Sequence, residues 1–204
     1  MSFFKNTRNL VASGILGAIG SVLMLINFNI PSIMPVFIKF DVSELPAILA
    51  SFAYGPLGGV MVCLVKNVLN LVLGSDTAGV GELSNFILGC AYVIPAGLIY
   101  QKHRTFKGAI VGALTGCFTS AILCWFTNNF IVYPLYGLLG WTEELILSMY
   151  QAIFPFVNTL EEAIFVFNVP FTFIKLFVTA IITFLIYKRL SPLLRGKKQN
   201  KKEA

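Results

Sequence analysis

Long apolar stretches with few charges are the feature that most limits what this chain can fold into. Four of them run over residues 9–27, 82–100, 108–132 and 163–187. Each has the length of about 20 residues that an α-helix needs to cross a lipid bilayer. The whole chain is 57% hydrophobic and 12% charged, whereas soluble domains are typically about 25% charged. These stretches predict an all-α integral membrane protein.

A fifth apolar stretch, residues 46–73, is interrupted by Gly55-Pro56. Proline has no backbone N–H and disfavours helical geometry at the residue before it. The stretch is therefore either one kinked span or two short helices that fold back on each other.

The basic residues distinguish these alternatives. Most of the 15 lysines and arginines fall before the first span, in the loop 101–107, or in the tail from residue 188 onward, and most acidic residues lie elsewhere. Lysine and arginine concentrate on the cytoplasmic side of membrane proteins. All three basic groups share one side only if the chain reverses at Gly55-Pro56. We therefore predict a six-transmembrane-helix bundle in a bacterial plasma membrane, with both termini cytoplasmic.

This topology divides the chain simply. Residues 1–195 are predicted to form a single membrane domain, and residues 196–204 a basic cytoplasmic tail. The second helix, about 46–54, is too short to span the bilayer at 1.5 Å per residue. The outer loop 28–45 carries many bulky apolar residues and is expected to fold over the bundle as a lid. Residues 138–162 are expected to form an interfacial helix or a short hairpin outside.

Ionisable residues inside a membrane are functional candidates by default. Lys175 shares one helical face with Asn168 and Thr172 and lies in the outer half of the last span. We interpret this face as part of an outward-opening pocket; the alternative is a lysine that snorkels to the interface. Lys66, beside Asn67, is instead interpreted as structural and paired with a carboxylate, either Asp41 or Glu44.

Catalysis, metal binding and nucleic-acid binding have no support in the sequence. The one histidine, His103, lies in a basic loop, and no phosphate-binding glycine loop is present. The four cysteines form no C-x-x-C pair, so we interpret them as packing residues and predict no metal site. A rival hypothesis is an intramembrane enzyme that uses Glu143 or Glu161, and another is a membrane subunit without any ligand.

The first span carries small residues at helical spacing. One set is Gly14-x-x-x-Ala18, and a second is Ser13-x-x-x-Gly17-x-x-x-Ser21. Small residues at this spacing let two membrane helices approach closely. Such a face serves either packing within the bundle or docking of another membrane protein.

Several segments are similar to one family of membrane proteins. They are FDVSELPAILASFAYGPLGG, LVKNVLN, GELSNF, NNFIVYPLYG, VPFTFIK and FLIYKRL. Over about residues 9–195 the chain resembles the substrate-binding S component of energy-coupling factor (ECF) vitamin transporters, and most closely the riboflavin-specific members. One departure is Thr172, where those members carry asparagine in the pattern P-F-N-x-x-K.

The resemblance implies a six-helix bundle that captures a vitamin from outside, without a cofactor of its own. It implies as partners a membrane coupling protein, docked on the Gly14 and Ala18 face, and two ATPase subunits. Riboflavin or a close flavin is the expected ligand, with pantothenate and folate as alternatives. The candidate binding residues are Phe37, Phe40, Asp41, Gly81, Asn85, Asn128, Tyr133, Thr172 and Lys175.

Overall fold

A computed structural model describes residues 3–194, with side chains for residues 3–186. The basic tail predicted at 196–204 lies outside the described residues. Within them every regular element is helical, apart from one isolated β-bridge between Phe28 and Phe40. The main helices are α1 (Thr7–Leu25), α2 (Glu44–Tyr54), α3 (Pro56–Gly74), α4 (Val80–Lys102), α5 (Phe106–Thr127), α6 (Tyr133–Leu138), α7 (Glu143–Gln151), α8 (Leu160–Ala163) and α9 (Val169–Leu194), after a short 3₁₀ turn η1 (Phe3–Lys5).

Two π-helical turns lengthen the helices of the second half. The turn η2 (Asn128–Val132) joins α5 to α6, and η3 (Ile164–Asn168) joins α8 to α9. Both joined helices are long: Phe106–Leu138 and Leu160–Ile186 are continuous apolar segments. Together with α1, α3 and α4 they make five helices in the described chain that are long and apolar enough to cross a membrane. Many large apolar side chains on these helices face outward, as contact with lipid requires.

The chain reverses at Gly55, so the predicted hairpin is present. Gly55 has φ = 91°, a left-handed conformation that glycine adopts without steric cost. Pro56 occupies the first turn of α3, where its missing N–H leaves no helical bond unmade. An added Cβ on Gly59 would lie 2.9 Å from the Cβ of Ser51. This close approach shows that α2 and α3 pack directly against each other. At 11 residues, α2 is shorter than a bilayer span.

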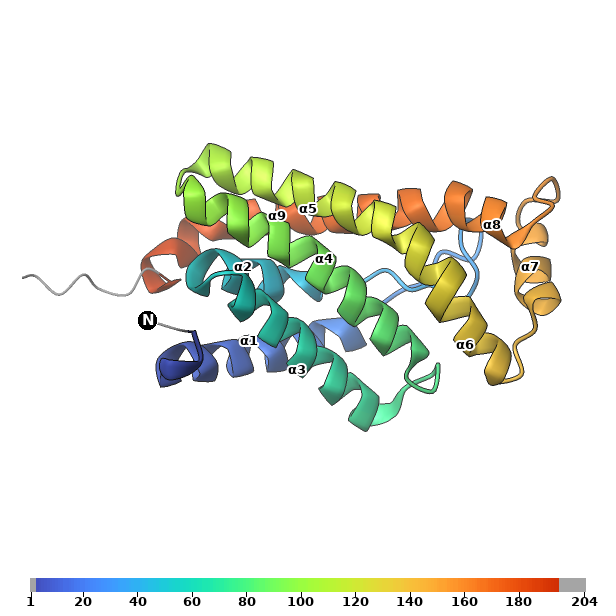
Figure 1. The fold of residues 1–204 in the computed structure, drawn as a ribbon, viewed down its shortest axis with the longest axis horizontal. Helices are drawn as coiled ribbons and strands as arrows, with labels where there is room; N and C mark the ends of the chain where they lie inside the picture. The colour runs from blue at the N-terminus through green and yellow to red at the C-terminus, as the bar shows by residue number, and fades with distance from the viewer. Residues whose placement is uncertain (1–2, 195–204) are drawn as a thin grey trace, which may run out of the picture.

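Figure 1 places the start of α1, the α2–α3 turn, the α4–α5 loop and the end of α9 at one end of the bundle. A polar cleft at this end is bordered by Arg8, Gly55, Gln101 and Arg104. The basic residues at the start of α1 and after α4 therefore meet beside the hairpin turn. This is the arrangement that the charge distribution predicts.

The segment between α1 and α2 is ordered by its own hydrogen bonds. The backbones of Phe28 and Phe40 exchange two N–H···O bonds of 3.0 and 2.7 Å. Inside this bridge, Asn29 Nδ2 donates to the carbonyls of Pro35 and Ile38 at 2.9 and 2.6 Å. The segment 26–43 is therefore a closed Ω-shaped loop, and we call it the lid loop.

A second apolar core lies beyond the main one and fixes the lid loop. Met34, 1% exposed, packs there among residues from α6, α7, α8 and η3. The segment 138–162, expected as an interfacial helix or hairpin, supplies α7 with its buried Ile146 and Tyr150. This segment and the lid loop thus pack together over one end of the bundle.

The two small-residue sets of α1 face different ways. Ser13, Gly17 and Ser21 are buried, and an added Cβ on Gly17 would lie 2.6 Å from Val65 of α3. Gly14 has open space around it and Ala18 is exposed. The first set therefore serves packing within the bundle, and the second is left on the outer surface.

Candidate functional site

A cavity of about 1240 Å³, open solvent included, lies at the end of the bundle away from the Gly55 turn. Its wall is built from the ends of α1, α3 and α5 and the starts of α4 and α9. Phe37, Ile38 and Lys39 of the lid loop border it as well. Apolar side chains make up much of its lining and several polar side chains converge on it, as is usual in sites that bind small organic molecules.

The structure brings most of the predicted binding residues to this cavity. Eight of them border it: Phe37, Asp41, Gly81, Asn85, Asn128, Tyr133, Thr172 and Lys175. Phe40 does not line the cavity. Its ring packs instead against Phe28 of the lid loop and against Phe171, which is itself a lining residue. Phe40 therefore supports the cavity wall from behind.

Lys175 does not snorkel to the surface. Its side chain is 11% exposed, and its Nζ donates to Asp41 Oδ2 at 2.7 Å. The other oxygen, Asp41 Oδ1, accepts the backbone N–H of Ser43 at 2.9 Å. Burial by itself raises the pKa of Asp41, but Lys175, Lys66 and the bond from Ser43 outweigh it and hold that pKa below its ordinary value. Asp41 thus ties the end of the lid loop to α9 as an ion pair.

A second buried ion pair lies directly behind the first. Lys66 of α3 is fully buried and donates to Glu44 Oε1 at 2.5 Å and to Ser43 Oγ at 2.8 Å. Of the two partners expected for Lys66, the structure selects Glu44, and the structural interpretation of Lys66 is correct. The residues Asp41, Ser43 and Glu44 therefore attach the start of α2 to both α3 and α9.

The two π turns place asparagines in the cavity wall. Asn128 begins η2 and Asn168 ends η3. Asn168 Nδ2 donates to Tyr133 Oη at 2.8 Å, and Tyr150 Oη donates to Asn168 Oδ1 at 2.6 Å. Asn128 Nδ2 donates to the carbonyl of Cys124 at 2.9 Å, and Thr172 Oγ1 lies 3.2 Å from Cys124 Sγ. A π turn shifts the register of a helix and is frequent at functional sites.

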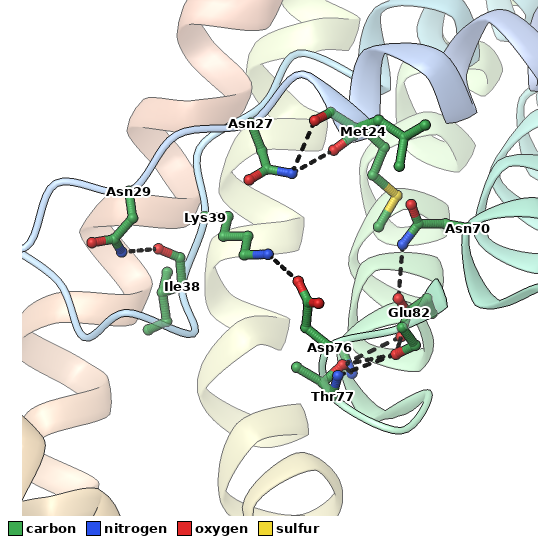
Figure 2. Close-up of polar contacts among 12 residues, drawn as sticks. Met24, Asn27, Asn29, Ile38, Lys39, Asn70, Asp76, Thr77 and Glu82 are labelled. Atoms are coloured by element: carbon green, nitrogen blue, oxygen red, sulfur yellow. Dashed lines mark hydrogen bonds and ion pairs between the residues drawn. The ribbon is translucent and has the colours of Figure 1, made fainter. Parts of the chain in front are cut away.

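The opposite wall, on α3 and α4, carries a carboxylate. Figure 2 shows Glu82 facing Asn70 and Thr77. Glu82 is 6% exposed and accepts bonds from Asn70 Nδ2 at 2.8 Å, Ser75 Oγ at 2.7 Å and Thr77 Oγ1 at 3.3 Å. Figure 2 also shows Lys39 of the lid loop bonded to Asp76 at the cavity rim. The lid loop is thus held to α9 on one side and to the α3–α4 loop on the other.

Comparison with known proteins identifies the fold. The family model described as "ECF transporter, substrate-specific component" matches residues 8–187. A solved structure of the S component of a bacterial ECF transporter superposes with a TM-score of 0.72, at 32% identity, covering 93% of this chain and 98% of the other. The chain belongs to the substrate-specific (S) components of ECF transporters. It is therefore a membrane-embedded transport protein.

Curated relatives of this S component are named as riboflavin transporters. The chain is 31% identical to riboflavin transporter RibU of Staphylococcus aureus (strain TCH60), over 94% of each chain. It is 33% identical to riboflavin transporter FmnP of Bacillus subtilis (strain 168), over 91% of this chain and 93% of the relative. Both are transporters by name, in agreement with the absence of a catalytic motif from the sequence.

Some cavity residues of the S component were not among the predicted ones. Glu82 borders the cavity beside the predicted Gly81, but it looks in the sequence like an ordinary acidic residue in the first turn of a helix. Asn168 was placed on the correct face of the last span, but its bonds to two tyrosines depend on the π turn η3. Asn70 of α3 also borders the cavity. Its bond to Glu82, which joins α3 to α4, has no signal in the local sequence.

Proposed function

We propose that this S component binds riboflavin, or a close flavin, in the cavity between the lid loop and the starts of α4 and α9. It then delivers the vitamin inward together with ATP-driven partners, which the family implies are a membrane coupling protein and two ATPase subunits. The observation that carries the proposal is the lining of the cavity: eight residues predicted for flavin binding border it, and they combine apolar surface with convergent polar groups.

The topology of the proposal has six membrane-inserted helical segments, namely α1, α2, α3, α4, α5 with its extension through α6, and α9. Both termini are cytoplasmic, and the cavity opens outward. The meeting of Arg8, Gly55 and Arg104 at one end supports this orientation, because basic residues favour the cytoplasmic side. In this topology residues 1–195 make up one membrane domain, followed by the basic tail at 196–204.

Polar groups on η2 and α9 would recognise the flavin. We expect Asn128, Thr172 and Lys175 to bond the polar edge of the ring or the ribityl chain, while Phe37 and Tyr133 supply apolar surface. The hydroxyl of Thr172 can both donate and accept a bond, so it takes part where riboflavin-specific members carry asparagine. Asp41 already holds Lys175 in position at the cavity wall.

The surface of α1 supports docking of the coupling protein at Gly14 and Ala18. Both residues are small and lie on the outer face, while the buried set around Gly17 holds α1 to α3. A helix of the coupling protein could therefore approach the backbone of α1 closely without disturbing the bundle.

The experiment is a titration of the purified chain in detergent with riboflavin, followed by quenching of flavin fluorescence. Quenching should saturate at one flavin per chain. Lys175→Ala should weaken binding by at least about tenfold, the effect of losing one charged hydrogen bond. Lys107→Ala, in the first turn of α5 at the other end of the bundle, is the matched control and should leave binding unchanged.

The same preparation tests the alternatives. Saturable binding of pantothenate or folate, with no response to riboflavin, would contradict the flavin assignment while leaving the transporter class intact. Binding of none of these vitamins would favour a subunit without a ligand. Full flavin binding together with a reaction that is lost in Glu143→Gln or Glu161→Gln would favour the intramembrane enzyme.

A further inference from the structure

Among the residues that border the cavity, negative charges outnumber positive ones. Two lysines, Lys39 and Lys175, face four carboxylates, which are Asp41, Glu44, Asp76 and Glu82. Nearly all of these charges are neutralised in pairs: Lys175 with Asp41, Lys39 with Asp76, and Glu44 with Lys66 behind the wall.

Glu82 is the exception. Its three hydrogen-bond donors, Asn70, Ser75 and Thr77, are all neutral. Among the side chains that the structure describes, no lysine, arginine or histidine lies within ion-pair distance of it. These donors stabilise the ionised carboxylate without cancelling its charge. The cavity therefore keeps one uncompensated negative charge.

This charge is buried, which makes it effective. Glu82 is 6% exposed, so water and salt screen it much less than they screen a surface carboxylate. At the effective dielectric constant of a protein, repulsion by Glu82 would weaken the binding of a ligand that carries a negative charge within about 10 Å by roughly tenfold or more. A neutral ligand would lose nothing.

We propose that Glu82 is a charge-selectivity residue, which lets the cavity accept a neutral vitamin and reject its anionic forms. The inference rests on the flavin function proposed above and specifies it. Riboflavin is uncharged at neutral pH, whereas a phosphomonoester carries a charge of about −1.5 to −2. The ligands disfavoured are therefore phosphorylated flavins, and equally vitamins that carry carboxylates, such as pantothenate and folate.

The test compares riboflavin with flavin mononucleotide, which have the same fluorescent ring. Dissociation constants are measured by fluorescence quenching for the full chain in detergent. The wild type should bind riboflavin at least about tenfold more tightly than the mononucleotide. Glu82→Gln, which keeps the shape of the side chain, should reduce this ratio by about tenfold, chiefly because the mononucleotide binds more tightly.

A second variant keeps the carboxylate of Glu82 and balances its charge with a neighbouring cation. Asn70 is half-buried and already donates to Glu82, so Asn70→Lys would place a cation beside the carboxylate. It should reduce the ratio as Glu82→Gln does. Glu161→Gln removes an equal charge from α8, outside the cavity, and should leave the ratio unchanged.

Three results would overturn the inference. They are an unchanged ratio in both cavity variants, an equal change in Glu161→Gln, and loss of riboflavin binding in both cavity variants, since Glu82 would then be needed for the vitamin itself. Failure of the wild type to bind riboflavin would instead contradict the proposed function. The two failures are thus distinguishable.

Discussion

The ion pair between Asp41 and Lys175 can be tested with a double-mutant cycle on thermal stability. Their charged atoms lie 2.7 Å apart, and their side chains are 4% and 11% exposed. Removing one partner of a buried pair typically costs about 3–5 kcal/mol, because the remaining charge is buried and uncompensated. Lys175→Met should fall near the lower end, about 3 kcal/mol, since Asp41 keeps the N–H of Ser43.

The double variant Asp41→Asn/Lys175→Met should be more stable than the sum of the two single changes predicts. It leaves no buried charge at the site, and neutral replacements of a buried pair are often tolerated. For a chain of this size 1 kcal/mol corresponds to about 2–4 °C. Lys175→Met alone should therefore melt about 6–12 °C below the wild type, and the double variant should recover part of that loss.

The four cysteines provide the assay. None is disulfide-bonded; Cys63, Cys117 and Cys124 are buried, and Cys90 is partly buried. A thiol-reactive dye should therefore report unfolding as the buried cysteines become accessible. Because the pKa of Asp41 lies below its ordinary value of 3.8, the contribution of the pair is lost only as the pH falls through that lowered pKa. The coupling should thus be equal at pH 7 and pH 5. Strictly additive losses, or a Lys175→Met variant that melts with the wild type, would refute the reasoning.

Three further predictions follow from the packing and topology. Gly17→Leu should destabilise the isolated chain by about 1–3 kcal/mol through overpacking. Gly14→Leu should melt at the wild-type temperature but fail to copurify with the coupling protein. Equal melting temperatures of the two variants would contradict the assigned faces of α1. Tyr54→Cys and His103→Cys should react with an impermeant maleimide only in inside-out vesicles, and labelling from opposite sides would exclude the six-segment topology. Asn168→Leu should lower the free energy of unfolding by about 1–3 kcal/mol, because it removes hydrogen bonds from two buried tyrosine hydroxyls, and it should weaken flavin binding. A variant that melts at the wild-type temperature would contradict this prediction.

The helices and the hairpin were predictable because their signals are local. Span length, the Gly55-Pro56 break and the charge groups each depend on a few neighbouring residues, and the helical period alone places Thr172 and Lys175 on one face. The predicted pairing of Lys66 with Asp41 or Glu44 also succeeded, because a buried lysine between two candidate carboxylates requires a partner.

The remainder of the site depends on tertiary structure. A π turn is one extra residue in a helical turn, and neither Asn128 nor Asn168 differs in its local pattern from an asparagine in a regular helix. The bond between Tyr133 and Tyr150 joins α6 to α7 across a loop. That Glu82 lacks a cationic neighbour among the described side chains is a property of the folded wall, since Lys39 and Lys175, which also border the cavity, are each bonded to another carboxylate.

The contacts of the lid loop differ in strength along its length, and this limits where the cavity can open. Its end and the start of α2 are fixed by two buried ion pairs, through Asp41 to α9 and through Glu44 to α3. Its middle is held by Met34, which is buried in the second apolar core. The stretch around Lys39 is held by the exposed pair with Asp76, and exposed pairs contribute little to stability. We therefore expect the proposed flavin to enter by displacing the stretch around Lys39, while Met34 and the start of α2 stay in place. The residues of α9 that are proposed to bind the flavin would then keep the same positions in the open and closed cavity, because the Asp41–Lys175 pair would hold in both.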